Sequence, residues 1–567
     1  MIPTIVVFCY LAVVLYIGVF AFRRGKTSGE DYFLASRGLG NWVFLLSLFG
    51  TNMTAFAILG SSGLAYQRGI GVYGLMASAS GFVIPLTIFF IGTRLWALGK
   101  KFGHMTQVQY FRDRWECSAI GTLIFALTAA MLVPYIIIGV MGGGQTLEAL
   151  STIMGPDGKP QMFEALRNGQ TVLEHRHWIS YEAGGGLVAV VVMSYVFFGG
   201  MRGTAWVNTF QTILFLCFGT LAFLLVGHNL GGFDKLVESL AANPKTAPLL
   251  TRQRIPVEEF FSYTFIPLSS IMFPHIAIMC MTAKKAAAFK KTVIFYPLCI
   301  MVIWVPSVFL GVLAAGQFPG LAAGESDDVI LRLLTEHTHT IVAGALGASI
   351  MACVMASDSQ ILALCTMFTE DVFAYYGGKR KFGETAQVWT GRAFVVLVTL
   401  LAYVLAIRLK DKAGIFELAI RFAFSGFAAL APVMLAALFW RRSTKFGALA
   451  SVLWVLVALL GTFYLYETTA GIAPKPGQPP AQIFPALGNL FLRTPGNVTI
   501  YGYLPVMFLV LGSAAFMIVV SLLTAAPSRA TIEKYFPSRT VNAPPPSESS
   551  SRSYGHPSLP ELIHPGR

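Results

Sequence analysis

Long apolar segments recur along this chain, and they constrain its fold more than any other feature. A membrane-spanning helix needs about twenty predominantly apolar residues, and segments of this kind lie at residues 3–22, 41–66, 71–97, 118–146, 183–200, 206–227, 260–282, 292–316, 341–374, 389–408, 413–439, 446–467 and 500–524. Only 12% of the 567 residues are charged, whereas soluble domains have about 25%. The sequence therefore predicts an all-α polytopic membrane protein with about thirteen transmembrane helices.

Basic residues are distributed unevenly between the segments that join these helices. If the N-terminus lies outside, most of the 41 Lys and Arg residues fall on the cytoplasmic side, as basic residues of short loops do. Arg23 and Arg24 follow the first apolar segment, which is the reverse of the order in a secretory signal peptide. We therefore expect a plasma (inner) membrane protein with an external N-terminus and a cytoplasmic C-terminus. The net charge of +14 reflects this orientation and predicts no nucleic-acid partner, since no basic-aromatic module occurs.

Two of the apolar segments contain residues that interrupt a helix. Residues 50–54 (GTNMT) place polar side chains near the middle of the second segment, and Pro267 and Pro274 interrupt the seventh. A pair of interrupted helices at corresponding places in two inverted halves is typical of an alternating-access carrier with its binding site at the bilayer midplane. The alternative for residues 50–54 is a helix contact made by small and hydroxyl residues.

Five motifs resemble the landmarks of one transporter family, in the family's order. They are GEDYFLASRGLGNW (29–42), GGMRGTAWVNTFQ (199–211), FPHIAIMCMTAKK (273–285), DSQILALCTMFTED (358–371) and FSGFAALAPVMLAALFWRRSTKFGALAS (424–451). The sequence is thus similar to the sodium:solute symporter family. The resemblance implies a LeuT-type fold of two inverted five-helix repeats, with one helix before them and two after. It also implies sodium-coupled uptake of a small organic solute by alternating access.

The resemblance also implies a division of the chain into domains. We expect a first helix and cytoplasmic loop, a first repeat, an extracellular loop, a second repeat, two C-terminal helices, and a disordered cytoplasmic tail rich in Pro and Ser. The corresponding limits are 1–40, 41–227, 228–259, 260–439, 440–526 and 527–567.

The family's sodium position maps onto the second and ninth apolar segments. The resemblance implies that Gly50, Met53 and Ala352 offer main-chain carbonyl groups and that a pair of hydroxyl side chains completes the site. In an alignment without a gap that pair falls on Met355 and Ala356, which have no side-chain oxygen. At least one of the family's usual ligands is therefore missing from this chain.

Nearby residues offer substitutes for the missing oxygen atoms. A one-residue gap brings Ser357 into the pair, and Ser359 shares a helix face with Ala352, Met355 and Ala356 and lies one turn beyond the pair. A carboxylate in a membrane span costs about 2.5–3.5 kcal/mol, so Asp358 should pair with a cation, a proton or a basic residue. The alternative is that Asp358 bonds Ser or backbone groups and has a structural role. We expect Na⁺ as the coupling ion, with H⁺ as the alternative, and no cofactor.

Asn208 stands where many members of the family that the chain resembles have an aspartate, which some of them use near an additional sodium ion. Because Asn carries no charge, we expect one coupling cation and not two.

Candidate solute contacts lie at the two interrupted segments and in the fourth. They are Asn52, Thr54, Phe56, Ser270 and Phe273, together with Tyr135, which matches a position that relatives place near the pocket. Proline-carrying relatives have aromatic residues shortly before the Pro-His of the seventh segment, whereas this chain has Ile266, Ser270 and Phe273 in that neighbourhood. Proline is therefore disfavoured, and the solute's identity stays open among amino acids, monocarboxylates, sugars, pantothenate-like acids and urea-like molecules.

Other functional classes have less support. The sequence contains no HExxH motif, GxGD motif or nucleophile elbow, so we do not expect an enzyme. A proton-coupled or uncoupled carrier of the same fold and a transporter-like sensor remain as alternatives. Arg421 has Glu417 four residues earlier, a spacing that favours an ion pair; the alternative is that it attracts an anionic solute. We expect a monomer.

Overall fold

The computed structural model describes residues 2–25, 28–153, 155, 161–167, 170–321, 325–410, 414–474 and 478–537. Within these residues, ten helices are long and apolar enough to cross a membrane, or twelve if each of two bent helix pairs counts as one span. One of the ten, α9 (Tyr181–Asn229), has 49 residues and would be ~74 Å long, more than twice the ~30 Å hydrocarbon core of a bilayer. It therefore contains two spans, and the described chain has the thirteen that the sequence predicts.

The two spans of α9 meet at Gly200, where the chain adopts φ 50° and ψ −147°. A side chain is disfavoured at this positive φ, and a Cβ atom would also lie 2.5 Å from the carbonyl oxygen of Tyr32. Glycine is therefore required where the chain turns back into the membrane.

The first five-span unit begins with a broken helix. The helix α3 ends at Asn52, and the chain resumes at Phe56 at an angle of 58°. The amide of Met53 still bonds to Phe49 and Gly50, whereas Met53 itself has the non-helical ψ of 88°. The described helices of the N-terminal half are α1 (Ile2–Arg23), α2 (Gly29–Leu34), η1 (Ala35–Arg37), α3 (Asn41–Asn52), η2 (Phe56–Gly60), α4 (Ser61–Arg68), α5 (Gly71–Thr87), η3 (Ile88–Gly92), α6 (Thr93–Phe102), α7 (Gln107–Trp115), α8 (Ser118–Leu150) and α9.

The second five-span unit also begins with a broken helix, which bends by 44° between Ile271 and Pro274. Proline lacks a backbone N–H, so Pro274 can begin a helix but cannot continue the preceding one. Both interruptions predicted from the sequence are thus confirmed. The helices of this part are α10 (Phe233–Ala242), η4 (Ala247–Leu250), α11 (Val257–Ser262), η5 (Tyr263–Ile271), α12 (Pro274–Met281), α13 (Ala287–Gln317), η6 (Ser326–Asp328), α14 (Val329–His337), α15 (Thr340–Val354), η7 (Met355–Ser357), α16 (Asp358–Met367), η8 (Phe368–Ala374), α17 (Gly378–Leu409), α18 (Ile415–Leu418), η9 (Ala419–Phe424) and α19 (Ser425–Phe439).

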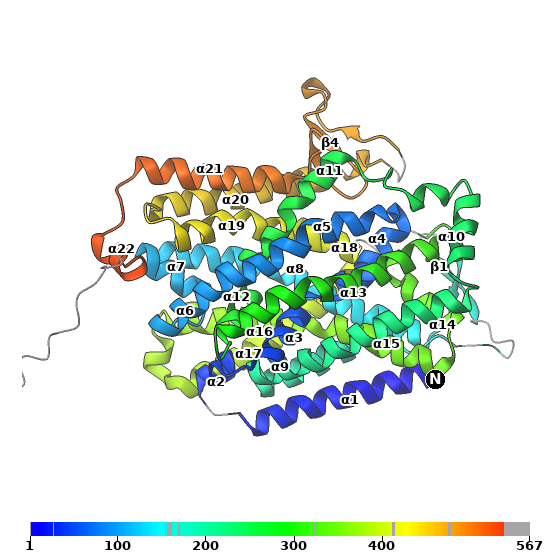
Figure 1. Ribbon diagram of the computed structural model, residues 1–567, viewed down its shortest axis with the longest axis horizontal. Coiled ribbons are helices and arrows are strands. Elements are labelled where there is room, and N and C mark those ends of the chain that lie inside the picture. Colours follow the sequence, from blue (N-terminus) through cyan, green and yellow to red (C-terminus); the bar gives the residue numbers. More distant parts are fainter. Residues whose placement is uncertain are drawn as a thin grey trace, which may run out of the picture. The chain divides into compact units, whose positions relative to one another are not determined.

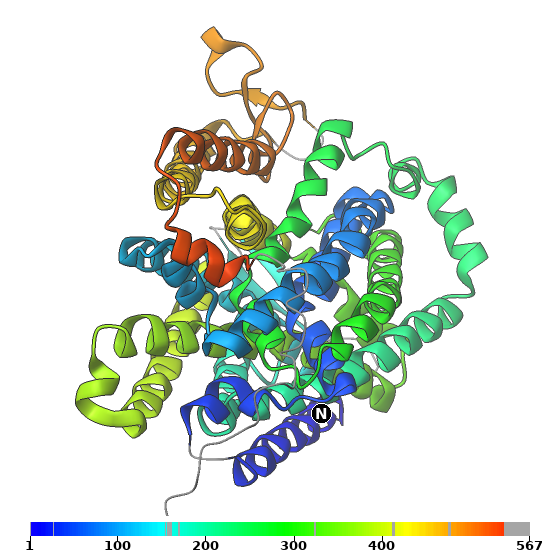
Figure 2. The same cartoon turned by 60° about the vertical axis from the view of Figure 1, so that its left-hand side comes forward.

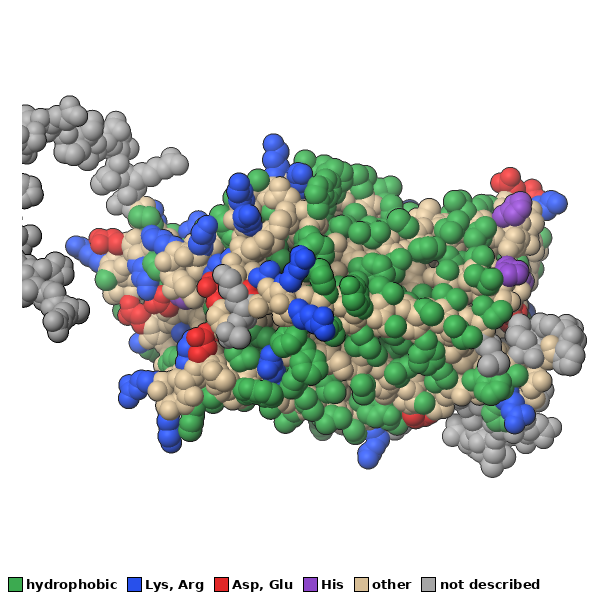
Figure 3. Space-filling model, turned by 90° about the horizontal axis from the view of Figure 1, so that it is seen from below, with side chains coloured by type: hydrophobic (Ala, Val, Ile, Leu, Met, Phe, Trp, Pro, Cys, Tyr) green, Lys and Arg blue, Asp and Glu red, His purple; other side chains and the backbone are tan. Residues whose placement is uncertain are grey.

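The most buried spans lie around the two broken helices (Figures 1 and 2). Most residues of the span α15–η8 and of the span α18–α19 are buried, whereas in α17 and α20 (Lys445–Thr468) less than a third of the most apolar window is buried. On the face drawn in Figure 3, hydrophobic side chains cover most of the middle, and Lys and Arg gather towards the end where α6 and α7 lie in Figure 1. The packed interior therefore coincides with the interrupted helices.

Short strands occur in two of the loops, which the sequence did not predict. The strand β1 (Met162–Arg167) pairs antiparallel with β2 (Gln170–His175). Between α20 and α21 (Pro505–Leu523), the short helices η10 (Ala470–Ile472) and η11 (Pro485–Leu487) accompany a sheet of order β3-β4-β5, with β3 (Ala481–Gln482), β4 (Phe491–Arg493) and β5 (Val498–Ile500).

Residues 528–567 form a separate unit. Its helix α22 (Arg529–Tyr535) falls within the tail expected to be disordered, so that expectation was wrong for these seven residues. The side chain of Ser528 accepts a hydrogen bond from the amide of Thr531 and caps this helix. A helix of two turns is too short to show a clear apolar period. Residues 538–567 lie outside the described part of the chain.

Candidate functional site

The carboxylate of Asp358 lies fully buried between α16, α9 and α3. Its Oδ2 atom accepts a hydrogen bond from the hydroxyl of Tyr195 at 2.9 Å. Its Oδ1 atom accepts from Nδ2 of Asn208 at 3.1 Å and from the hydroxyl of Ser359 at 2.9 Å. Within the described residues this charge has no basic partner, and only neutral donors stabilise it.

The amide of Asn208 is the centre of this cluster. Its Nδ2 atom lies 2.8 Å from Oγ of Ser359, 3.1 Å from Oδ1 of Asp358 and 3.2 Å from Oγ1 of Thr51, and the two hydroxyl groups also bond to each other. An amide nitrogen has two hydrogen atoms, so it cannot serve three acceptors fully. Its Oδ1 atom is buried without a hydrogen-bond partner. We call Thr51, Asn208, Asp358 and Ser359, with Tyr195, the Asp358 cluster.

Three elements far apart in the sequence bring the Asp358 cluster together. Thr51 precedes the break in α3, Asn208 and Tyr195 lie on the two arms of α9, and Asp358 begins α16 after the 3₁₀ turn η7. Gln360 donates from Nε2 to the carbonyl oxygen of Thr51 at 3.0 Å and fixes the end of α3 to α16. Sequence reasoning missed Tyr195 and Gln360, because no spacing in the chain relates them to Thr51.

The carbonyl groups at the break of α3 face α15, in the span that carries Asp358. The thiol of Cys353 lies 3.1 Å from the carbonyl oxygens of both Met53 and Thr54. The carbonyl oxygen of Gly50 accepts the amide of Met53 at 3.1 Å. Met53 therefore lies beside Cys353, the residue that follows Ala352.

The side chains after Ala352 point in different directions. Met355 accepts a hydrogen bond on its sulfur from the hydroxyl of Tyr10 at 3.6 Å. Ser357 packs so closely against Gly139 of α8 that a Cβ atom added to Gly139 would collide with the hydroxyl of Ser357. The structure thus brings Asp358 and Ser359 to Thr51, and it places Ser357 on the side of α8.

A cavity of about 500 Å³, partly open to solvent, adjoins the break of α3. It is lined by residues of α5, η5, α13 and η9 and by the break itself. Four of the six predicted solute contacts line it, namely Asn52, Phe56, Ser270 and Phe273. Tyr135 lies behind this wall, stacked on Phe273 with ring centroids 5.6 Å apart, and its hydroxyl is 3.5 Å from that of Thr54.

Arg421 lies next to the cavity-lining Ile420 but is engaged elsewhere. Its Nη2 atom is 3.6 Å from the carboxylate of Glu417 and donates to the carbonyl oxygen of Gly496, and its guanidinium lies 3.5 Å from the ring centre of Tyr466. The ion pair predicted from the i, i+4 spacing is therefore confirmed.

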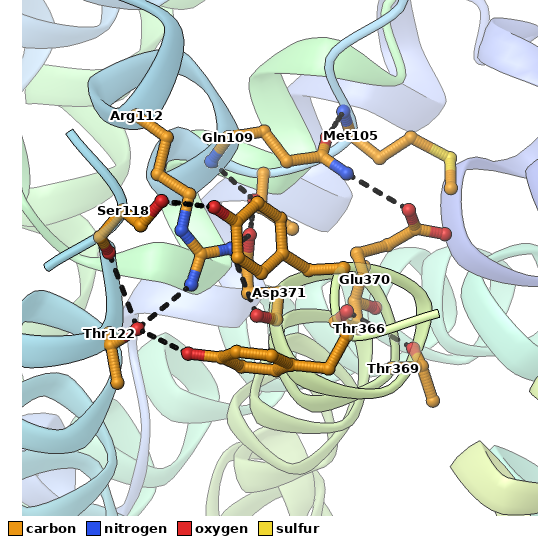
Figure 4. Close-up of polar contacts among 12 residues, drawn as sticks. Met105, Gln109, Arg112, Ser118, Thr122, Thr366, Thr369, Glu370 and Asp371 are labelled. Carbon is orange, nitrogen blue, oxygen red and sulfur yellow. Dashed lines mark hydrogen bonds and ion pairs between the residues drawn. The ribbon is translucent and has the colours of Figure 1, made fainter. Parts of the chain in front are cut away.

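A second polar cluster joins α7 to η8 (Figure 4). Arg112 donates to the carbonyl oxygen of Asp371 at 2.9 Å and lies 3.6 Å from its carboxylate. Gln109 donates to Glu370 at 2.9 Å. Because a guanidinium already occupies this cluster, it ties α7 to the end of the span that carries Asp358 and is no site for a second cation.

Comparisons with known proteins place this arrangement among transporters. The sequence model of the sodium:solute symporter family matches residues 32–154 and 161–454. The chain is 26% identical to the sodium/proline symporter of Salmonella typhimurium over 83% of this chain and 90% of that protein. It is 25% identical to the sodium/pantothenate symporter of Haemophilus influenzae over 80% of this chain and 89% of that protein.

Among solved structures, a Na⁺-coupled sialic acid symporter in a substrate-bound outward-open state superposes with a TM-score of 0.67 at 14% identity. The match covers 93% of this chain and 99% of that one. The two chains share the LeuT-type fold.

Proposed function

Because the chain belongs to the sodium:solute symporter family, we propose that the Asp358 cluster holds the sodium ion that drives its transport. The protein is a multi-pass membrane transporter that couples sodium to the symport of a small solute. Its family and relatives are transporters and not enzymes. Which residues bind the ion and the solute is our proposal.

The observation that carries the proposal is the position of the Asn208 amide. Its nitrogen lies among three oxygen atoms of Thr51, Asp358 and Ser359 at 2.8 to 3.2 Å, while its own oxygen is buried and unpaired. Rotation of the amide by half a turn would place Oδ1 where the nitrogen now lies, so that the cluster would present only oxygen atoms and a cation among them would replace the hydrogen bonds that the nitrogen donates. Carboxylate, hydroxyl and amide oxygens are ligands that hard cations prefer.

The proposed site spans the two inverted halves. Thr51 belongs to the first unit and Asp358 and Ser359 to the second, so a bound ion would hold α3 against α16. Asn52, the next residue, lines the cavity. Ion binding at Thr51 and solute binding at Asn52 would therefore act on the same broken helix, which is how the two equilibria become coupled.

The remaining predicted ligands have a smaller part in this proposal. The carbonyl oxygen of Met53 already has the thiol of Cys353 as a partner, so we assign Gly50, Met53 and Ala352 a secondary part in ion binding. We do not assign Ser357 to the site, because it packs against Gly139. One coupling cation is proposed, because Asn208 is neutral.

A proton is the second candidate for the coupling ion. It is favoured by one observation, namely that all three donors around the buried Asp358 are neutral groups. A carboxylate in this position can be neutralised by a proton as well as by Na⁺.

The solute site and the orientation are also proposals. We propose that the solute binds in the cavity against Asn52, Phe56, Ser270 and Phe273. We propose an external N-terminus, a cytoplasmic C-terminus and a monomer in the plasma (inner) membrane, with repeats at 41–227 and 260–439. The gathering of Lys and Arg at the end where α6 and α7 lie supports this orientation (Figure 3).

The experiment compares the thermal stability of the purified full-length protein in NaCl and in KCl. A ligand that binds only the folded state raises stability by RT ln(1 + [L]/Kd). We expect Na⁺ to raise the melting temperature of the wild type and not of Asp358→Asn, while the matched control Asp234→Asn, at an exposed position on α10, responds like the wild type. An undiminished Na⁺ response of Asp358→Asn would refute the site, and a response to pH alone would favour the proton.

A further inference from the structure

The cavity beside the α3 break has a lining without charge, and this limits what it can hold. None of the described residues that line it is Asp, Glu, Lys, Arg or His. An ion moved from water into an apolar cavity loses its hydration, and without an opposite charge that loss is not recovered. No described side chain of the lining therefore balances a carboxylate or an ammonium group on the solute, and the proposed Na⁺ already has the carboxylate of Asp358 as its counter-charge.

The nearest arginine side chains do not alter this balance. Arg68 forms a two-point ion pair with Glu259, with both distances at 2.6 Å. Arg421 is held by Glu417, Gly496 and Tyr466, as described above. Both guanidinium groups are thus directed to other partners and leave the cavity neutral.

Two buried polar atoms of the lining lack a partner. Asn52 is 6% exposed and Trp304 is 3% exposed, and neither Oδ1 of Asn52 nor Nε1 of Trp304 makes a hydrogen bond. A buried polar group without a partner costs about 1–3 kcal/mol. A bound molecule could satisfy both atoms if it donates a hydrogen bond to Asn52 and accepts one from Trp304.

The side chains that carry the two free atoms meet α13 about two turns apart. Nδ2 of Asn52 donates to the hydroxyl of Tyr296 at 2.7 Å, which directs the amide oxygen away from α13. Tyr296 and Trp304 are eight residues apart on α13, which is about 12 Å along a helix axis. The donor and the acceptor of the ligand should therefore lie at opposite ends of it.

Aromatic rings form much of the wall. Phe56 lies 4.9 Å from Phe424 between ring centroids, and Phe424 lies 5.3 Å from Phe273, all three on the cavity. The three rings pack against one another and together present an apolar surface on which a flat apolar or aromatic body can pack. A polyol would leave most of its hydroxyl groups unpaired against this wall.

We propose that the transported solute is an uncharged molecule with an aromatic or flat apolar body, a hydrogen-bond donor at one end and an acceptor at the other. The donor bonds to Asn52 and the acceptor to Trp304. This inference rests on the proposed solute site, and it excludes carboxylates, amines and zwitterionic amino acids as the main cargo.

The test uses probes that share one ring and differ in charge. Binding to the purified full-length transporter in NaCl is measured by calorimetry for 4-hydroxyphenylacetamide (neutral), 4-hydroxyphenylacetate (anion), tyramine (cation), tyrosine (zwitterion) and myo-inositol (neutral polyol). We expect the neutral amide to bind at least about tenfold more tightly than each of the others. Equal or tighter binding of a charged probe or of myo-inositol overturns the proposal, and so does failure of the amide to bind.

Two further comparisons test the hydrogen bonds separately. The N,N-dimethyl-4-methoxy derivative of the amide has no donor and should bind about three- to tenfold more weakly, as expected for one lost hydrogen bond. Trp304→Phe should weaken binding of the amide by a similar factor, and the matched control Trp206→Phe, on the half-exposed surface of α9, should not. Unchanged affinity in either test contradicts the assigned contact.

Repeating the titrations in KCl separates this inference from the proposed coupling. If the neutral amide is preferred in both salts with equal affinity, the solute class stands and sodium coupling fails. If a charged probe is preferred only in NaCl, coupling stands and the solute class fails.

Discussion

Exchanging Asn208 and Asp358 tests whether the carboxylate of the cluster serves the cation. Nδ2 of Asn208 and Oδ1 of Asp358 are 3.1 Å apart, so the two side chains occupy adjacent parts of the same site. Asp358→Asn leaves the cluster without a charge. The double variant Asn208→Asp/Asp358→Asn restores one carboxylate and one amide with their positions interchanged.

The size of the effect follows from the distance between the groups. The nitrogen of Asn208 and Oδ1 of Asp358 are 3.1 Å apart. A cation and a carboxylate at that separation attract each other by about 5 kcal/mol at an effective dielectric constant of 20. Asp358→Asn removes an attraction of this order, but it also removes the cost of burying the carboxylate. We therefore expect Na⁺ affinity to fall by roughly ten- to a thousandfold, or about 1.4–4 kcal/mol.

The single variant Asn208→Asp provides the opposite perturbation. It places two carboxylates about 3 Å apart, and two like charges at that distance cannot both stay ionised without a cation or a proton. We expect it to bind Na⁺ at least as tightly as the wild type.

The assay is binding of radioactive ²²Na⁺ to the purified protein, which requires no knowledge of the solute. Each variant must elute as a single species from gel filtration, so that loss of binding is not loss of folding. We expect the double variant to recover affinity to within about tenfold of the wild type. If it binds no better than Asp358→Asn, the carboxylate acts only at its own position and the reasoning is refuted.

Two further perturbations test the packing and the electrostatics of the structure. Gly50→Ala places a Cβ atom against the hydroxyl of Thr212 and should lower the free energy of unfolding by about 1–3 kcal/mol. The control Gly219→Ala, whose added Cβ atom would have nothing within 4 Å, should raise the free energy of unfolding slightly. Chemical unfolding measures both, and equal effects of the two variants would contradict the close packing at the break. Asp327 lies in η6, outside the spans, is 3% exposed and accepts the amide of Ile415 at 2.8 Å. Burial raises the pKa of its carboxyl well above 3.8. Its protonated form is therefore favoured in the folded state, so its contribution is complete below about pH 3.8 and is lost as pH rises towards the raised pKa. The melting temperature of Asp327→Asn should depend less on pH over this range than that of the wild type, and identical pH profiles would refute the assignment.

Local sequence determined much of the architecture. The spans and their two interruptions follow from apolar length and from Pro and polar residues within them, because a bilayer leaves helices few alternatives. The pairing of Arg421 with Glu417 follows equally from helical spacing. The sequence also singles out Asp358, since a charge in a span is costly unless a partner compensates it.

The partners themselves were decided by packing. Tyr195 and Asn208 lie about 150 residues before Asp358 and meet it only because α9 turns back at Gly200. Likewise, the thiol of Cys353 donates to the carbonyl oxygen of Met53. The side chain of Ser357, in the 3₁₀ turn between α15 and α16, packs against α8. No periodicity in the sequence encodes these contacts.

The sequence by itself determined that this chain crosses the membrane as broken and unbroken helices, because burial of apolar segments and loss of backbone hydrogen bonds are local properties. Only the tertiary structure decided that oxygen atoms of two distant helices, α3 and α16, converge on Asn208 of α9, and that the described lining of the neighbouring cavity carries no charged side chain. Those properties depend on which side chains face one another across the bundle, and that follows from the packing of whole helices.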